Sequence, residues 1–264
     1  MPLRRRFTNT TRLFDRWRGI VSFQDLFKQW WRVGGAFGIA FAVLFIIGVI
    51  ILQAEPPMRD DSIQDIRKYF MDDGTKYLVG DYLTGIAFVV LFLPYVVTLR
   101  WVLGSGEGWP PIWSWLTVIG GVAMVALGGA GSLAFGTLAI SADNKEINDS
   151  SVRLLVEMNT YAFNLFSFGM VLFVGSASVA ILRTRVLWRW LPVLGLLAAI
   201  LLIVGAAWPI DGDDQGIVAV PGFIGAPLTL LFVVLSSINM LMMKDEPAAT
   251  ERAERRPPVA SPAV

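Results

Sequence analysis

The chain contains neither cysteine nor histidine. Without cysteine it can form no disulfide, offers no thiolate nucleophile and cannot ligate an iron–sulfur cluster. Without histidine it lacks the usual haem ligand, the commonest ligand of zinc and copper sites, and the imidazole base of catalytic triads. These two absences predict no metal site, no cofactor and no familiar catalytic constellation, so we expect that the protein is not an enzyme.

Charged residues are also scarce. They make up 16% of the 264 residues, whereas a soluble domain carries about 25%. Hydrophobic residues make up 55%, and the mean hydropathy is +0.60, as expected for a chain surrounded mostly by lipid. Six runs are long and apolar enough to cross a bilayer as helices. The sequence therefore predicts an all-α, polytopic membrane protein with transmembrane helices at about residues 33–54, 78–103, 112–141, 154–182, 188–208 and 221–243.

Several features lie outside these spans or interrupt them. The N-terminal region, 1–32, is basic and has aromatic residues at helical spacing, which predicts an amphipathic helix at the cytoplasmic membrane surface. A second amphipathic helix is expected on the outer surface, beginning at a cap on Ser62 and ended by Gly74. In the span that follows, Pro94 predicts a kink. The tail, 244–264, alternates charges with alanine and proline and is expected to be disordered.

The third span is unusually rich in glycine and other small residues. Small residues allow the backbones of two membrane helices to approach closely. We therefore expect this helix to be central in the bundle, with Gly128 and Ser132 facing another helix at close range.

The distribution of charge predicts the orientation of the chain. Six spans place both termini on the same side of the membrane. If that side is the cytoplasm, most Lys and Arg residues lie inside and most Asp and Glu residues lie outside. Cytoplasmic loops of membrane proteins carry an excess of Lys and Arg, so cytoplasmic termini are expected.

Polar residues within the apolar spans mark a candidate ligand-binding site, because each is costly in hydrocarbon unless it is paired or hydrated. They lie on the outer halves of the second and fourth spans, where they would line a cavity open to the outside. The candidate residues are Asp81, Thr84, Glu157, Thr160, Tyr161 and Asn164.

A simpler, structural interpretation of the same residues is the one that we favour. Glu157 would pair with Arg153, one helical turn earlier. Asp81 would cap the second membrane helix, and Asn164 would hydrogen-bond across a helix interface. Both acids lie near a membrane border, where water solvates them at little cost.

Short motifs along the chain carry a resemblance to a known family. They are IQDIRKYF from Ile63, YLTGIA from Tyr82, Phe92-Leu93, Leu99-Arg100, and Arg183-Thr-Arg185 followed by Trp190-Leu-Pro192. Together they resemble a family of uncharacterised six-span membrane proteins common in actinobacteria and related bacteria. In that family an acidic–Ile–x–x–Tyr–Tyr segment precedes a second span of the type Tyr–Leu–x–x–Leu–Ala. The resemblance covers about Val33 to Met243 and implies a multi-pass protein of a bacterial plasma membrane, but it implies no activity and no functional residues.

Three classes of function fit these features. The favoured class is a structural or accessory membrane component, or a subunit of a larger assembly, which contacts the lipid bilayer and a membrane-protein partner or further copies of itself. The second is a small-molecule or lipid transporter or binding protein with a polar cavity open to the outside. The third is a membrane enzyme, for which Asp81 and Glu157 are the carboxylate pair to nominate. No feature suggests binding to nucleic acid.

Overall fold

The computed structural model of the chain describes residues 30–52, 60–141, 147–211 and 216–243, and within these ranges it contains helices and no strand. Five continuous helical stretches of the described chain are long and apolar enough to span a membrane, and α8 is a sixth, shorter apolar helix. The predicted all-α polytopic membrane fold is therefore confirmed. The helices are α3 (Trp30–Leu52), α4 (Ile63–Ile86), the π-helix η1 (Ala87–Phe92), α5 (Leu93–Glu107), α6 (Ile112–Ser141), α7 (Asp149–Thr184), α8 (Leu191–Gly205), α9 (Trp208–Asp211) and α10 (Val220–Met242).

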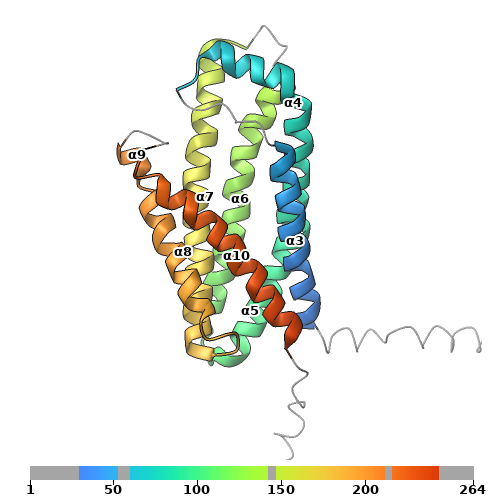
Figure 1. Cartoon of the computed structure of the whole chain (residues 1–264), viewed down its shortest axis with the longest axis vertical. Coiled ribbons are helices and arrows are strands. Elements are labelled where there is room, and N and C mark those ends of the chain that lie inside the picture. The colour runs from blue at the N-terminus through green and yellow to red at the C-terminus, as the bar shows by residue number, and fades with distance from the viewer. Residues whose placement is uncertain (1–29, 53–59, 142–146, 212–215, 244–264) are drawn as a thin grey trace, which may run out of the picture.

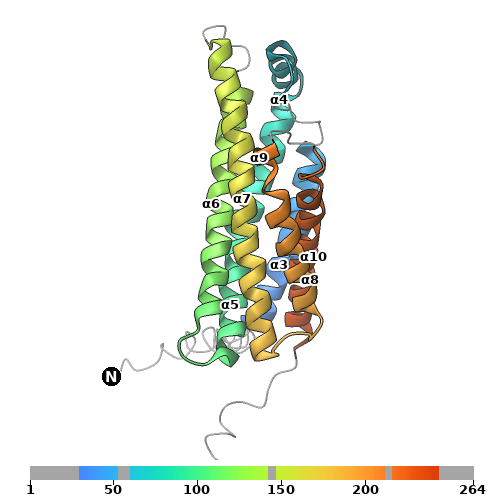
Figure 2. The same ribbon diagram turned by 90° about the vertical axis from the view of Figure 1, so that its left-hand side faces the viewer.

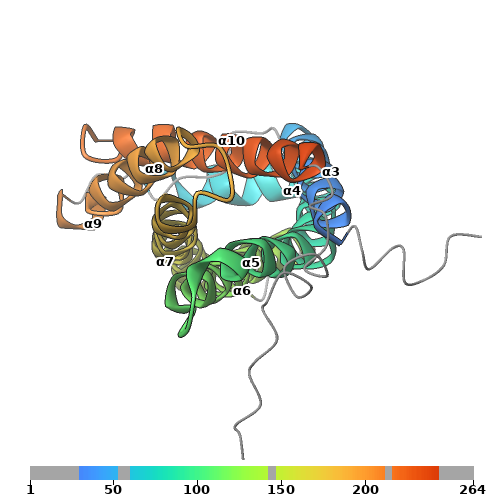
Figure 3. The same ribbon diagram turned by 90° about the horizontal axis from the view of Figure 1, so that it is seen from below.

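The long helices run up and down in one bundle. The start of α3 and the end of α10 lie at the same end, the lower one in Figure 1. Seen from below, α8 and α10 form one row and α5 and α6 another, while α7 joins the rows at one edge and α3 at the other (Figure 3). The predicted tail, 244–264, and all but the last three residues of the predicted N-terminal region, 1–32, lie outside the described residues.

The second span differs from the prediction at its outer end. Ser62 does cap the helix, since its hydroxyl accepts a hydrogen bond from the Asp65 amide at 3.2 Å. The first turns of α4 also lie across the end of the bundle (Figure 1). However, the predicted end of this helix at Gly74 is wrong, because α4 continues through Gly74 to Ile86. A Cβ on Gly74 would lie 3.3 Å from the Ala139 carbonyl oxygen, so this glycine permits close helix contact instead of ending a helix.

Proline and glycine shape the helices at two other places. Before Pro94 the helix widens into the π-helical segment η1, which accommodates a residue that has no amide hydrogen to donate. The fifth span is shorter than predicted, because α8 ends at Gly205, where a Cβ would lie 2.2 Å from the Gly222 amide nitrogen of α10. Fifteen residues rise only about 22 Å, against a hydrocarbon core of about 30 Å, and the chain then turns into α9.

The main core lies where α3, η1, α5, α7 and α10 meet. Phe92 is fully buried, with its ring centre 4.9 Å from that of Phe41 and 5.2 Å from that of Phe173. Phe173 in turn contacts Phe232 of α10 at 6.4 Å. Aromatic rings at these separations stabilise one another beyond the area they bury, so this chain of rings ties four segments of the sequence together.

A second, smaller core lies between the ends of α4, α6 and α7 that extend beyond the other helices (Figure 2). We call these ends the head. The 36 residues of α7 rise about 54 Å, well beyond the thickness of a hydrocarbon core. The buried residues of the head core are Ile66, Phe70, Tyr77, Phe135, Leu138, Val152 and Val156.

Candidate functional site in the projecting head

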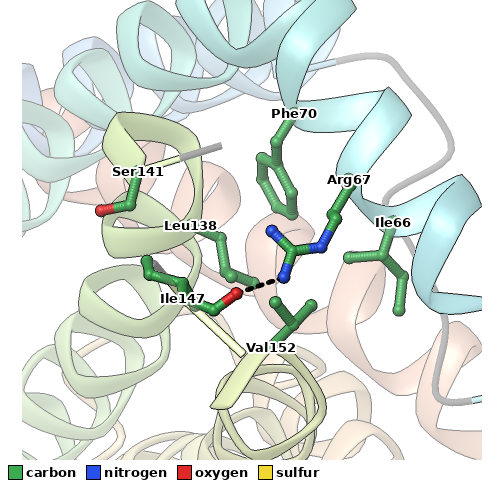
Figure 4. Close-up of a pocket in the computed structure, with 7 residues that line it drawn as sticks. All are labelled: Ile66, Arg67, Phe70, Leu138, Ser141, Ile147 and Val152. Carbon is green, nitrogen blue, oxygen red and sulfur yellow. Dashed lines mark hydrogen bonds between the residues drawn. The ribbon is translucent and has the colours of Figure 1, made fainter. Parts of the chain in front are cut away.

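Within the head, Arg67 joins α4 to the loop that precedes α7. Its guanidinium donates to the carbonyl oxygen of Ile147 (Figure 4). The same Nη2 atom lies 3.2 Å from the Asp149 carboxylate. The Arg67 side chain is 24% exposed, whereas that of Asp149 is 72% exposed. The charge of Arg67 is therefore held at the edge of the head core, with Phe70 beside it, and is partnered there by a carbonyl and a carboxylate.

A second arginine, on α7, makes the reciprocal contact with the chain before α4. Arg153 donates to the carbonyl oxygen of Asp61, just before α4, at 3.0 Å. An arginine on each helix thus binds main-chain oxygen at the beginning of the other. Hydrogen bonds to charged groups contribute more than those between neutral groups, so these two contacts fix the position of α4 across the end of α7.

An open groove lies beside these contacts on the surface of the head. Its volume is about 490 Å³, and it combines apolar side chains with side chains of both charges. Glu157, one of the predicted site residues, lines it. The other lining residues are Ile63, Asp149, Ser150, Arg153 and Leu154.

The predicted partners of Glu157 on the second span belong to another interface. Thr84 is buried and faces α3, where a Cβ on Gly48 would lie 2.7 Å from its methyl carbon. Its hydroxyl donates to the main-chain carbonyl of Asp81 at 2.9 Å. Asp81 does not cap a helix as the structural interpretation expected, because it lies well inside α4.

The remaining predicted residues lie along α7 but have separate contacts. Thr160 donates back to the Val156 carbonyl, and the ring of Tyr161 stacks on Trp208 with 6.3 Å between ring centres. Asn164 is buried and donates to the carbonyl oxygen of Ala206, at the end of α8, at 2.8 Å. The expectation that Asn164 bonds across a helix interface is confirmed.

The expected pairing of Glu157 with Arg153 is not formed. Ion pairs within the described ranges join Arg67 to Asp149 and Lys76 to Asp73. Arg153 instead reaches back to the chain before α4. Arg153 and Glu157 both line the groove.

Sequence reasoning missed Arg67. It follows the buried Ile66 and lies three residues before the buried Phe70. A basic residue between two core positions was the available signal, but its partners lie about 80 residues later and could not be identified without the fold.

The described residues include no group of three or more acidic side chains arranged to hold a metal ion. Comparison of the chain with protein-family models, with curated proteins and with solved structures finds no match.

Proposed function

We propose that this protein is a structural or accessory component of a membrane assembly, and that its head is the part that contacts a partner protein. The observation that carries the proposal is the second core. Three helices continue past the other helices of the bundle and pack around their own set of buried side chains. A separately packed projection presents a fixed surface at a distance from the bilayer, which suits docking of another protein.

We further propose an orientation and a location. The described arginines at the end opposite the head include Arg100, Arg183, Arg185 and Arg189, whereas the head carries most of the described acidic residues. An excess of basic residues favours the cytoplasmic side. The head would then face outward from a bacterial plasma membrane, with both chain termini in the cytoplasm.

The groove beside Glu157 is the proposed contact surface on the head. Arg153 and Glu157 offer both charges, and Leu154, 57% exposed, offers apolar area between them. Charged groups at an interface select a partner by complementarity and exclude partners of like charge. The expected occupant is a partner segment that carries both charges around an apolar side chain.

Site-specific photo-crosslinking in cells tests this proposal. A photoreactive residue in place of Leu154 should give a discrete protein adduct, and the same residue in place of Ile203, which is 52% exposed on α8, should not. Glu157→Lys should abolish the adduct and also the co-purification of the same partner with the full-length chain. An adduct that persists with Glu157→Lys, or appears equally at residue 203, would count against docking at the groove.

Binding or transport of a small molecule is the alternative function, although the groove is wide open and would enclose little of a small ligand. The same experiment separates the two. A partner protein gives an adduct of increased mass at residue 154, whereas a small ligand gives a low-mass adduct in purified protein without any second chain.

A further inference from the structure

The end of the bundle opposite the head carries arginine side chains that lie on tryptophan rings. The guanidinium carbon of Arg100 lies 4.2 Å from the ring centre of Trp115, and that of Arg183 lies 5.7 Å from the ring centre of Trp113. Both tryptophans belong to the first turns of α6. Tryptophan is enriched where membrane helices meet the headgroup layer, so these pairs are at the level of lipid headgroups.

An apolar groove of about 300 Å³ begins at one of these pairs. Trp115, 51% exposed, belongs to both the cation–π contact and the groove. The groove continues along the outward side of α6 to Ile119, which is 53% exposed. Its walls are apolar or aromatic throughout, and its lining residues are Trp109, Pro110, Pro111, Ile112, Trp115, Leu116 and Ile119.

The charge of Arg100 has no anionic partner in the described part of the chain. Its Nε atom is buried and makes no hydrogen bond there. Glu107, the last residue of α5, accepts from the backbone amides of Trp113 and Ser114 at 2.7 and 2.9 Å and so caps α6. A half-buried guanidinium without a counter-ion is costly unless an external anion or water meets it.

From these observations we infer that an anionic phospholipid binds at this rim, with its phosphate on Arg100 and an acyl chain along the groove of α6. Arginine binds phosphate oxygens through parallel N–H groups, and basic sites beside membrane helices at the cytoplasmic side hold anionic headgroups. Arg100 lies seven residues before the end of α5, about 10 Å along the helix. The continuous apolar lining beyond Trp115 favours a lipid over a free phosphate.

Native mass spectrometry of the full-length protein in mild detergent tests this site, with phosphatidylglycerol and phosphatidylcholine as probes. We expect the protein to retain phosphatidylglycerol preferentially. Arg100→Gln should lower that retention about fivefold, to the level of phosphatidylcholine. Arg189→Gln, which removes an exposed arginine at the same end of the molecule, should leave it unchanged.

A second variant tests the groove without altering Arg100. Ile119→Trp fills the groove from a lipid-exposed position, so it should lower the retention of phosphatidylglycerol while the melting temperature stays that of the native protein. Equal loss with Arg100→Gln and Arg189→Gln would show diffuse attraction to a basic surface and overturn the site. Full retention with Ile119→Trp, or complete displacement of the lipid by glycerol phosphate, would overturn the assignment of an acyl chain to the groove.

Discussion

The hydroxyl oxygens of Tyr95 and Ser236 lie 2.6 Å apart in the centre of the bundle, and both side chains are completely buried. The two residues are separated by 141 positions in the sequence and join α5 to α10. Ser236 also donates within its own helix, toward the carbonyls of Phe232 and Val233. The phenol of Tyr95 therefore links α5 to α10 through a buried hydrogen bond.

Replacing Tyr95 with phenylalanine removes this bridge but keeps the ring that packs on Phe92. Because Ser236 retains acceptors in its own helix, we expect a small loss in the free energy of unfolding, about 0.6 kcal/mol, which is the average for a hydrogen bond between membrane helices. Thermal unfolding in detergent measures it. Tyr161→Phe is the matched control, because the Tyr161 side chain is 48% exposed. Equal stability of Tyr95→Phe and the native protein would show that the hydroxyl of Tyr95 does not stabilise the bundle.

Two glycines of α6 should differ in how much their replacement by alanine destabilises the protein. A Cβ on Gly120 would lie 2.3 Å from the Phe173 amide nitrogen, in the backbone of α7, whereas a Cβ on Gly129 would have no neighbour within 4 Å. Gly120→Ala must push α6 and α7 apart and should destabilise the protein by about 2 kcal/mol. Gly129→Ala adds the same methyl group to the same helix and should cause no loss. Equal melting temperatures for the two variants would contradict the close contact.

Helix limits that depend on hydrophobicity alone were predicted well. The third span was placed at 112–141, and α6 is Ile112–Ser141. The expected close contact of Gly128 is also observed, since its Cβ would lie 3.1 Å from the Phe166 ring. Long apolar runs with few charges specify a membrane helix locally, so such features can be read without knowledge of the fold.

Features that depend on neighbouring helices were predicted less well. A glycine after an amphipathic helix suggests an end, but Gly74 lies within α4 because α6 packs against it there. The polar residues of the second and fourth spans were grouped by depth, yet Thr84 packs on α3 and Asn164 bonds to the end of α8. Depth along a helix can be counted from the sequence, whereas the direction that a side chain faces depends on packing.

The contact of Arg67 with the loop before α7 should stabilise the start of α4 against local unfolding. Arg67→Gln removes the charge that binds the Ile147 carbonyl and pairs with Asp149. Amide hydrogen exchange in the segment Ile63–Phe70 should become about tenfold faster, which corresponds to about 1.4 kcal/mol, while exchange in the main core stays slow. Lys68→Gln removes an exposed charge one residue later and should change neither the exchange in this segment nor that in the main core. Unaltered exchange in the Arg67 variant would mean that the head core alone holds α4 in place.

Cysteine labelling tests the proposed orientation directly, because the native chain contains no cysteine and gives no background. Cysteines at Asp73 and Asp149 lie on the head, and a cysteine at Ser105 lies near the end of α5, at the opposite end of the bundle. If the basic end faces the cytoplasm, an impermeant thiol reagent added to intact cells should modify the two head positions. The cysteine at Ser105, which is an exposed position, should react only after the membrane is permeabilised. Labelling at Ser105 in intact cells, with protection of the head, would reverse the orientation and would place the proposed partner of the head in the cytoplasm.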